Sequence, residues 1–471
     1  MLAFQLRNAI YNIRFTTAAT TSSTVHRRNL SLTSLRWLSS PQLTPYDVNL
    51  VLRENEFSHI FIEGDNPLLG YESNQLASNK PVEDSRTEAS FIHKNAFICG
   101  IFDGHAGSAC SQVISKRLLR YIAAGLVDRK TLREEIAKGC TSQSFLKCHN
   151  DSQDFIKEIQ QIYEKSFARY VNNIVNTDMT PSEAMDKACM QLDSDMSEEA
   201  LEHNDLRTIM AVAMSGAVAC VAHIEGRDLS VVSTGDCAAV LGYQTDTGQW
   251  MSKKLSYEHN SDNLNEVKRI LSEHPPEEAD TVIRNDRLLS QLAPLRAFGD
   301  FRYKWSNEIM QKYVVANYGE NYMPPNYYTP PYLTAMPDII QHQLTTDDRF
   351  LVIASDGLWD FLSPNEVVSL VGEHLSCKKF LDPLKLPEGD VTLGQISDIL
   401  AKRKAGRQKK PLDQNSATHL IRNALGGTDY GIEHSKISYY LSLPQDVVRL
   451  YRDDITVTVI YFNSDYIKQL S

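Results

Sequence analysis

Four short acidic motifs in this sequence have the composition and the context of a metal-binding centre. They are Glu83-Asp84, Asp103-Gly104-His105, Asp356-Gly357 and Asp453-Asp454. Each stands at or beside the end of an apolar run of the kind that forms a β-strand. Side chains from distant parts of a chain can meet at such rigid positions, but several carboxylates in one cleft repel one another unless cations balance them. We therefore expect the four motifs to share one metal site.

The residue types indicate which ions and which chemistry the site would support. Carboxylate oxygens are hard ligands that suit Mg²⁺ or Mn²⁺ better than zinc. Water held by such ions can lose a proton near neutral pH and attack an electrophile, which makes hydrolysis the expected reaction. A single Asp-Gly pair most often marks an ordinary turn. The hypothesis therefore depends on the four motifs together.

The elements expected around these motifs are strands joined by hairpins and separate helical runs. Strands are expected at 96–102, 217–224, 229–233, 238–243, 350–355 and 455–462, and helices at 44–57, 108–124, 155–174, 181–203, 363–371 and 418–425. A polar passage without assigned structure extends from the first helix to Lys80. This order predicts an α+β layered domain over 41–471 rather than a doubly wound sheet. We expect surface insertions near 303–332 and 377–415, the second with a basic cluster.

Five short runs in this chain resemble the protein phosphatase 2C family and follow that family's order. They are I-F-D-G-H-A-G at 101–107, S-G-A-V-A at 215–219, S-T-G-D at 233–236, A-S-D-G-L-W-D at 354–360 and R-D-D-I-T-V at 452–457. The likeness extends from about Gly70 to Phe462. It implies an α-β-β-α sandwich, in which two antiparallel sheets are flanked by helices and the metals lie at one edge.

The resemblance also implies roles for the residues of the acidic motifs. Asp103 would bridge two Mg²⁺ or Mn²⁺ ions, Gly104 would offer its carbonyl to one ion, and Asp356 and Asp453 would complete the site.

Further residues would act around these two ions. Glu83 and Asp84 would hold metal-bound waters, and Asp236 would serve a third, more weakly bound ion. His105 would be the general acid that protonates the leaving serine or threonine oxygen, although a histidine at a turn is also consistent with a purely structural role.

This chain departs from the family pattern at several positions. Many family members carry a phosphate-binding arginine four residues before the first acidic pair, but this chain has Asn79 there. The sequence therefore does not identify the side chain that binds the substrate phosphate. Asn79 itself occupies the position of the usual arginine, and Lys80 is a candidate by proximity alone. Asp454 replaces a more usual asparagine, and the sequence assigns it no role.

Other stretches resemble one branch of the family, the pyruvate dehydrogenase phosphatases of the mitochondrial matrix. They are 43–45, 73–76, 295–300, 329–335 and 417–422, all outside the metal motifs. The resemblance implies phosphoserine on the E1 alpha subunit of pyruvate dehydrogenase as substrate. It also implies docking to the lipoyl domain of the E2 core with the help of calcium, and pairing with a regulatory subunit.

Composition limits where this protein acts and what it binds. The 471 residues carry a net charge of −11, which argues against general affinity for nucleic acid, and no apolar run is long enough to span a membrane. Residues 1–46 contain no Asp or Glu but hold Arg7, Arg14, Arg27, Arg28 and Arg36. This composition predicts a mitochondrial transit peptide over 1–40, with a disordered basic tail as the alternative. The eight cysteines form no Cys-x-x-Cys pair, so reduced thiols are expected.

The sequence gives little support to two other classes of phosphatase. No cysteine has an arginine at the Cys-x₅-Arg spacing of cysteine-dependent phosphatases. Asp193-Ser194-Asp195 has the letters of an aspartyl-phosphate enzyme, but it follows a helical and polar run. Two alternatives remain: a catalytically inactive scaffold of the same fold, and a matrix phosphatase that acts on another 2-oxoacid dehydrogenase.

Overall fold

The computed structural model describes residues 42–61, 66–150, 155–379, 392, 394–398, 400–401 and 412–470. The fold described below is that of the unit Leu43–Ser471. The predicted transit peptide, 1–40, lies outside the described residues. So does the basic cluster of the second insertion, which consists of Lys402, Arg403, Lys404, Arg407, Lys409 and Lys410.

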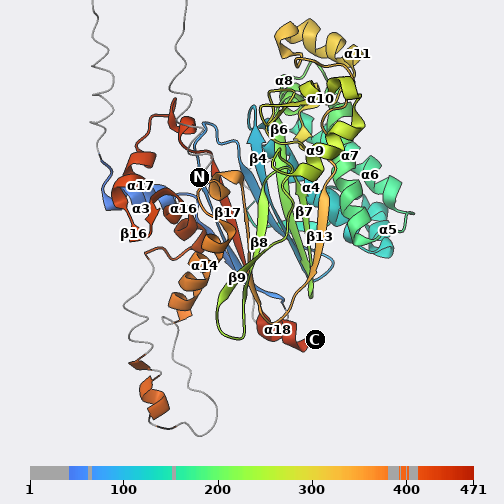
Figure 1. The fold of residues 1–471 in the computed structure, drawn as a ribbon. Helices are drawn as coiled ribbons and strands as arrows, with labels where there is room; N and C mark the ends of the chain where they lie inside the picture. The colour runs from blue at the N-terminus through green and yellow to red at the C-terminus, as the bar shows by residue number, and fades with distance from the viewer. Residues whose placement is uncertain are drawn as a thin grey trace, which may run out of the picture. The chain divides into compact units, whose positions relative to one another are not determined.

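One antiparallel sheet has six strands in the order β1-β2-β17-β14-β8-β9. Of these, β17, β8 and β9 are labelled in Figure 1. The strands are β1 (Phe57–Ile60), β2 (Leu68–Leu76), β8 (Ala238–Gln244), β9 (Trp250–Lys254), β14 (Asp348–Ala354) and β17 (Ile455–Phe462). The central pair β14 and β17 comes from segments a hundred residues apart in the sequence, and it brings two of the acidic motifs together.

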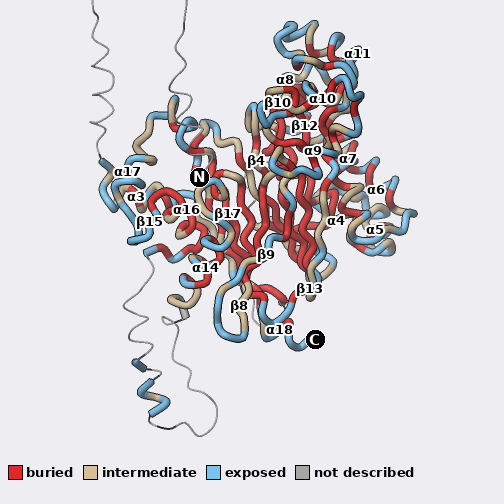
Figure 2. The backbone as a smooth tube through the Cα atoms, viewed as in Figure 1, coloured by how far each residue is buried: buried red, intermediate tan, exposed pale blue. Residues whose placement is uncertain are grey.

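The second sheet is also antiparallel and has the order β13-β7-β6-β4-β3-β5, with β12 paired to β6. Its strands are β3 (Ser85–Phe91), β4 (Ala96–His105), β5 (Leu146–Cys148), β6 (Gly216–Glu225), β7 (Asp228–Thr234), β12 (Phe298–Gly299) and β13 (Asp338–Gln343). Strands β4 and β6 are buried along almost their whole length (Figure 2). Burial on both faces explains why their sequences read as continuous apolar runs.

Helices cover the outer face of each sheet. The second sheet is covered by α4 (Ala109–Leu126), against which α6 (Lys157–Ile174), α7 (Pro181–Glu202) and α8 (Arg207–Met214) pack, with α5 (Arg129–Lys138) beyond. The first sheet is covered by α14 (Pro364–Lys379) and α16 (Ser416–Gly426), with α3 (Pro45–Arg53) and α17 (His434–Leu441) beyond (Figure 1). Strand β4 contacts β14 and β17, so the sheets face each other. This is the predicted α-β-β-α sandwich.

Smaller elements connect these layers. They are α9 (Leu264–Glu273), η2 (Pro276–Glu278), α10 (Ala279–Val282), η3 (Phe301–Tyr303), α18 (Ser464–Gln469) and the hairpins β10 (Ile283–Arg284) with β11 (Arg287–Leu288) and β15 (Gly427–Thr428) with β16 (Gly431–Ile432). Among the described residues, no helix combines the length and the apolar character needed to cross a bilayer.

Several predicted boundaries were wrong. Strand β4 does not stop at residue 102 but continues through His105, because β6 pairs with its last three residues. Helix α14 extends to Lys379, well past residue 371. The passage before Lys80 contains β1 and β2, which the pattern missed because the buried side chains of β2 include the polar residues Ser73 and Asn74. Asn74, fully buried, donates hydrogen bonds to the carbonyl of Leu52 and to Thr418 Oγ1, each at 2.7 Å.

The segment 303–332 is more ordered than its composition indicated. It contains α11 (Asn307–Ile309), η4 (Met310–Val315), α12 (Ala316–Tyr318) and η5 (Glu320–Tyr322). Its buried aromatic side chains include Tyr327, whose hydroxyl donates to the carbonyl of Trp305 at 2.6 Å, and Tyr332, whose hydroxyl donates to Glu278 at 2.5 Å. Aromatic rings with satisfied hydroxyls anchor this segment to the domain.

Candidate metal centre

The two sheets deliver three predicted metal ligands to one edge of the sandwich. Asp103 lies in β4, opposite Val218 of β6. Asp356 begins the short helix α13 (Asp356–Trp359), two residues after β14 ends. Asp453 stands two residues before β17 begins. Because β4 contacts both β14 and β17, carboxylates from three separate parts of the chain meet at this edge.

The electrostatics of these carboxylates show how closely they approach one another. Burial raises the pKa of Asp103 well above its usual range, and the charges of Asp84 and Asp356 raise it further. Burial also raises the pKa of Asp356, with additional contributions from Asp236 and Asp453. Five acidic side chains from different elements therefore share one environment.

Asp84 and Asp236 complete this group from neighbouring turns. Asp84 is buried, and its Oδ2 accepts hydrogen bonds from Ser355 Oγ at 2.8 Å and Thr456 Oγ1 at 2.6 Å. Burial, followed by the charge of Asp454, raises the pKa of Asp84 to about 7. Burial likewise raises the pKa of Asp236 to about 6.

The donor set fits hard divalent cations. Two buried oxygens, Asp84 Oδ1 and Asp356 Oδ1, lack a hydrogen-bond partner among the described residues, which is costly unless a cation uses them. Within the same residues, no three His, Cys, Asp or Glu side chains already enclose one point at ligand distance. Ions bound here would supply an activated water and positive charge toward a phosphoryl group.

The loop of Glu83 is packed against the end of β4. The Glu83 carbonyl accepts a hydrogen bond from Ser111 Oγ, and Glu83 Oε1 accepts one from the backbone N–H of Gly107 at 2.7 Å. A Cβ atom on Gly104 would collide with the Glu83 carbonyl and with Ser111. The glycine is therefore required where two backbone segments meet beside Asp103.

His105 is paired with a carboxylate that the motif analysis did not assign to the site. Its Nε2 lies 2.5 Å from Asp300 Oδ2, and only 2% of the Asp300 side chain is exposed. Burial alone would lower the pKa of His105, but the charge and hydrogen bond of Asp300 raise it above the ordinary value. A Cβ on Gly216 would occupy the space of this pair. Asp300 ends the stretch 295–300, which the sequence marked only as a feature of one branch.

Asp454 organises the loop that precedes the first acidic pair. Its carboxylate accepts hydrogen bonds from the backbone N–H groups of Ser78, Asn79 and Glu83, the last two at 2.8 Å. It also accepts one from Asn79 Nδ2 at 2.9 Å. The carboxylate to which the sequence gave no role thus fixes the backbone that carries Asn79 and Glu83.

An arginine that the sequence did not single out lies at the rim of the centre. Arg449 belongs to η6 (Val448–Leu450), and its NH1 donates to Asn79 Oδ1 at 2.7 Å and to Glu83 Oε2. Its NH2 lies 3.7 Å from Asp453 Oδ2. Lys80, the sequence candidate, is exposed, and it is Arg449 that contacts Asn79. No local motif marks Arg449, because its position follows only from the way η6 packs against the loop of Asn79.

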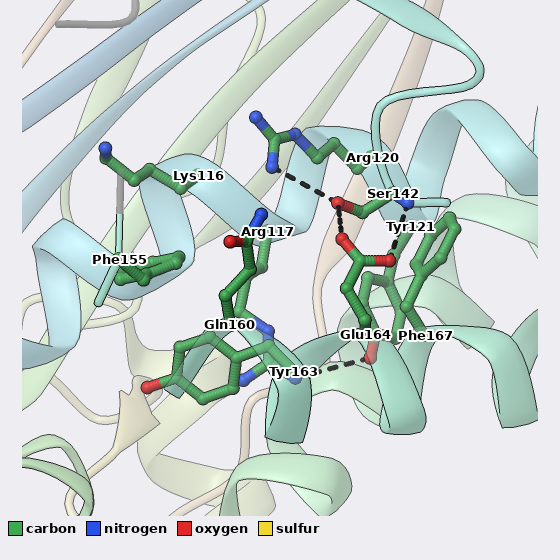
Figure 3. A pocket seen from close by; sticks show the side chains of 10 residues that line it. All are labelled: Lys116, Arg117, Arg120, Tyr121, Ser142, Phe155, Gln160, Tyr163, Glu164 and Phe167. Atoms are coloured by element: carbon green, nitrogen blue, oxygen red, sulfur yellow. Dashed lines mark hydrogen bonds between the residues drawn. The ribbon is translucent and has the colours of Figure 1, made fainter. Parts of the chain in front are cut away.

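Two cavities lie elsewhere and are not lined by these carboxylates. One, of about 20 Å³, lies between α4 and α6, where Arg117 and Tyr163 approach each other (Figure 3). It has room for roughly one water molecule. The other, of about 670 Å³, lies over β1, β2 and β17 beside α14, with Tyr71, Trp250 and Tyr461 in its wall.

The alternative phosphatase motif is structural. Asp193 and Asp195 lie within helix α7, as the sequence indicated. Asp193 pairs with Lys304 at 2.7 Å, and Asp195 pairs with Arg169 at 2.9 Å. All eight cysteines are free thiols, as predicted.

Comparison with known proteins identifies the class that the sandwich and its carboxylate edge define. The family described as Protein phosphatase 2C matches residues 80–394, so the chain belongs to this family and is a metal-dependent protein serine/threonine phosphatase. Members of this family in general depend on Mg²⁺ or Mn²⁺.

Three individual relatives are also similar to this chain over most of its length. The mitochondrial [pyruvate dehydrogenase [acetyl-transferring]]-phosphatase 1 of Bos taurus is 42% identical over 91% of this chain and 85% of its own length. The corresponding phosphatase 2 of Homo sapiens is 41% identical over 90% of this chain and 84% of its own length. The phosphatase 1 of Saccharomyces cerevisiae is 32% identical, with 87% and 71% covered.

Proposed function

We propose that this protein is a mitochondrial matrix phosphatase that removes phosphate from phosphoserine on the E1 alpha subunit of pyruvate dehydrogenase and thereby reactivates that complex. The observation that carries the proposal is the 42% identity to a phosphatase named for this reaction, spread over 91% of the chain. Identity at this level covers the segments outside the metal motifs, which distinguish one branch of the family from another.

The carboxylate inventory supports an active enzyme over an inactive scaffold. Asp103, Asp356 and Asp453 are all present and converge at one edge. An inactive relative has no need to keep buried acidic groups whose mutual repulsion destabilises the fold. We assign two ions to these residues and to the Gly104 carbonyl.

The surrounding acids take supporting roles in this proposal. Glu83 and Asp84 would orient waters at the ions, and Asp236 would serve a third ion. In the reaction, water attacks phosphorus from the side opposite the serine, and the phosphorus–oxygen bond to the serine breaks.

His105 then acts as the general acid. A seryl alkoxide is a poor leaving group, so protonation as the bond breaks lowers the barrier. The pairing with Asp300 at 2.5 Å fixes the ring and favours the protonated form that this role requires.

The proposed function also includes the partners that the family resemblance implies. Docking to the lipoyl domain of the E2 core, with calcium, would hold enzyme and substrate on one scaffold and raise their effective concentration. A regulatory subunit would bind the same catalytic chain.

A comparison of two substrates, with free lipoyl domain as a competitor, tests the substrate assignment. We expect faster phosphate release from intact phosphorylated pyruvate dehydrogenase complex than from a phosphopeptide of E1 alpha, and added free lipoyl domain should slow only the former. Hydrolysis of an aryl phosphate is the control, and it should be unaffected. A preference for phosphorylated branched-chain 2-oxoacid dehydrogenase would show that the substrate assignment is wrong.

A further inference from the structure

Helix η6 places a half-exposed cation against the acidic centre. The Arg449 side chain is 47% exposed, while its Glu83 partner is 13% exposed. The NH1 edge of the guanidinium donates to Asn79 and Glu83, whereas its Nε and NH2 make no hydrogen bond to the described residues. A group approaching the metal edge from outside could accept hydrogen bonds from these remaining donors.

Other cations near the site are not available in this way. Arg452 is buried and turned toward the backbone, because its NH2 donates to the carbonyl of Ala77 at 2.7 Å and its NH1 to that of Asp453 at 3.5 Å. Lys80 is exposed, but no hydrogen bond or ion pair of the described residues ties it to the carboxylates. Arg449 alone among these three combines exposure with contact to the centre.

A relay of hydrogen bonds sets the position of Arg449. Asp454 accepts from Asn79 Nδ2 at 2.9 Å, and Asn79 Oδ1 accepts from Arg449 NH1 at 2.7 Å. The buried carboxylate thus fixes the amide, and the amide oxygen fixes the guanidinium. Asn79 and Asp454 are positioning residues in this arrangement.

The chemistry of the guanidinium matches the substrate of the proposed reaction. A phosphoserine carries two negative charges and three acceptor oxygens, and a guanidinium can donate two parallel hydrogen bonds to such a group. The acidic side chains around the centre would otherwise repel the phosphate dianion. They are Glu83, Asp84, Asp103, Asp236, Asp356, Asp453 and Asp454. A fixed cation at the rim, paired with Glu83 and close to Asp453, lowers this repulsion.

We propose that Arg449 binds the phosphoryl group of the substrate, with Asn79 and Asp454 holding it in place. This proposal rests on the proposed phosphatase function. It assigns phosphate binding to a residue from the C-terminal part of the chain, positioned by the asparagine that stands where many relatives carry an arginine.

The test compares Arg449→Gln and Arg449→Lys with the unchanged enzyme, using phosphorylated E1 alpha and inorganic phosphate as a product inhibitor. Loss of charged hydrogen bonds should raise both KM and the inhibition constant for phosphate by roughly 10- to 100-fold in Arg449→Gln. Arg449→Lys should recover part of each. Arg287→Gln, which removes an exposed guanidinium that donates to the carbonyl of Gln291, is the matched control and should change neither constant.

Two further measurements separate phosphate binding from a structural role. Binding of Mn²⁺, followed by the electron paramagnetic resonance of the free ion, should be unchanged in Arg449→Gln. The double variant Asn79→Arg with Arg449→Gln should recover phosphate affinity, because residue 79 starts within hydrogen-bond distance of the lost group.

Unchanged KM and phosphate inhibition in Arg449→Gln would overturn the proposal, as would a loss that appears only as weaker Mn²⁺ binding. An unmodified enzyme without activity on any phosphoprotein would instead overturn the proposed function, and this is measured first.

Discussion

At the scale of single residues, the pair His105 and Asp300 has the clearest mechanistic consequence. The short contact at 2.5 Å with a buried carboxylate raises the pKa of His105 and so favours the protonated imidazole, although burial opposes that charge. A general acid matters most when the leaving group is strongly basic. The pair should therefore matter for serine esters and much less for esters of acidic phenols.

Substitution of either residue tests this consequence. His105→Gln should slow hydrolysis of a phosphoserine protein by roughly 10²- to 10⁴-fold and that of a nitrophenyl phosphate far less. Asp300→Asn should move the ratio of the two rates in the same direction by a smaller factor. The two rates are measured side by side with Asp262→Asn as an exposed control. Equal losses on both substrates would mean that His105 is structural or orients water instead.

The sequence predicted some residues of the site and missed others for a physical reason. The acidic motifs were recognisable because each stands beside an apolar strand and is short and local. Asp300, Arg449 and the role of Asp454 were not recognisable, because each acts through a partner about two hundred or more residues away. Such contacts depend on the packing of the two sheets and leave no spacing in the sequence.

At the scale of elements, strands with a local apolar pattern were predicted, whereas a strand whose buried polar side chains depend on contacts with other elements was missed. The runs that became β4, β6, β14 and β17 are apolar on both faces, because each is covered by the other sheet and by a helical layer. Strand β2 was missed because its buried side chains include Ser73 and Asn74, whose polarity is satisfied by contacts with other elements.

Strand β6 also carries a buried histidine that should make stability depend on pH. Burial, followed by the charge of Lys94, lowers the pKa of His223 to about 3. An unfolded histidine titrates near 6.5, so between roughly pH 3 and 6.5 the unfolded state binds one more proton here than the folded state. Stability from this group is therefore complete above pH 6.5 and falls as the pH drops through this window.

The variant His223→Leu tests this dependence. Near pH 5 the free energy of unfolding of the unchanged protein should fall by about 1.4 kcal/mol per pH unit more than that of the variant. Urea unfolding at pH 5 and pH 7.5 measures the difference, with equal m-values as the check that both unfold alike. Parallel pH profiles would show that His223 is not neutral in the folded protein.

At the scale of the whole molecule, the N-terminal leader should decide the compartment. Residues 1–40 lie outside the described part of the structure, and their composition, with five arginines and no acidic residue, is that of a transit peptide. We expect a reporter fused to residues 1–40 to enter mitochondria, and replacement of the five arginines by glutamine to abolish import. Fluorescence microscopy with a mitochondrial dye measures this. A cytosolic reporter with the intact leader would favour the basic-tail interpretation.

The central claim concerns the whole assembly of sheets, carboxylates and ions: buried aspartates at one edge of the sandwich bind the ions that hydrolyse phosphoserine. The most direct measurement is phosphate release from phosphorylated E1 alpha by chelator-treated enzyme, before and after Mg²⁺ or Mn²⁺ is added. The unchanged enzyme should be inactive without ions and active with them. Asp103→Asn and Asp356→Asn should remain folded by circular dichroism and lose roughly a thousandfold or more in turnover with saturating Mg²⁺. Near-normal turnover in either variant, or full activity of the chelated enzyme, would contradict the account.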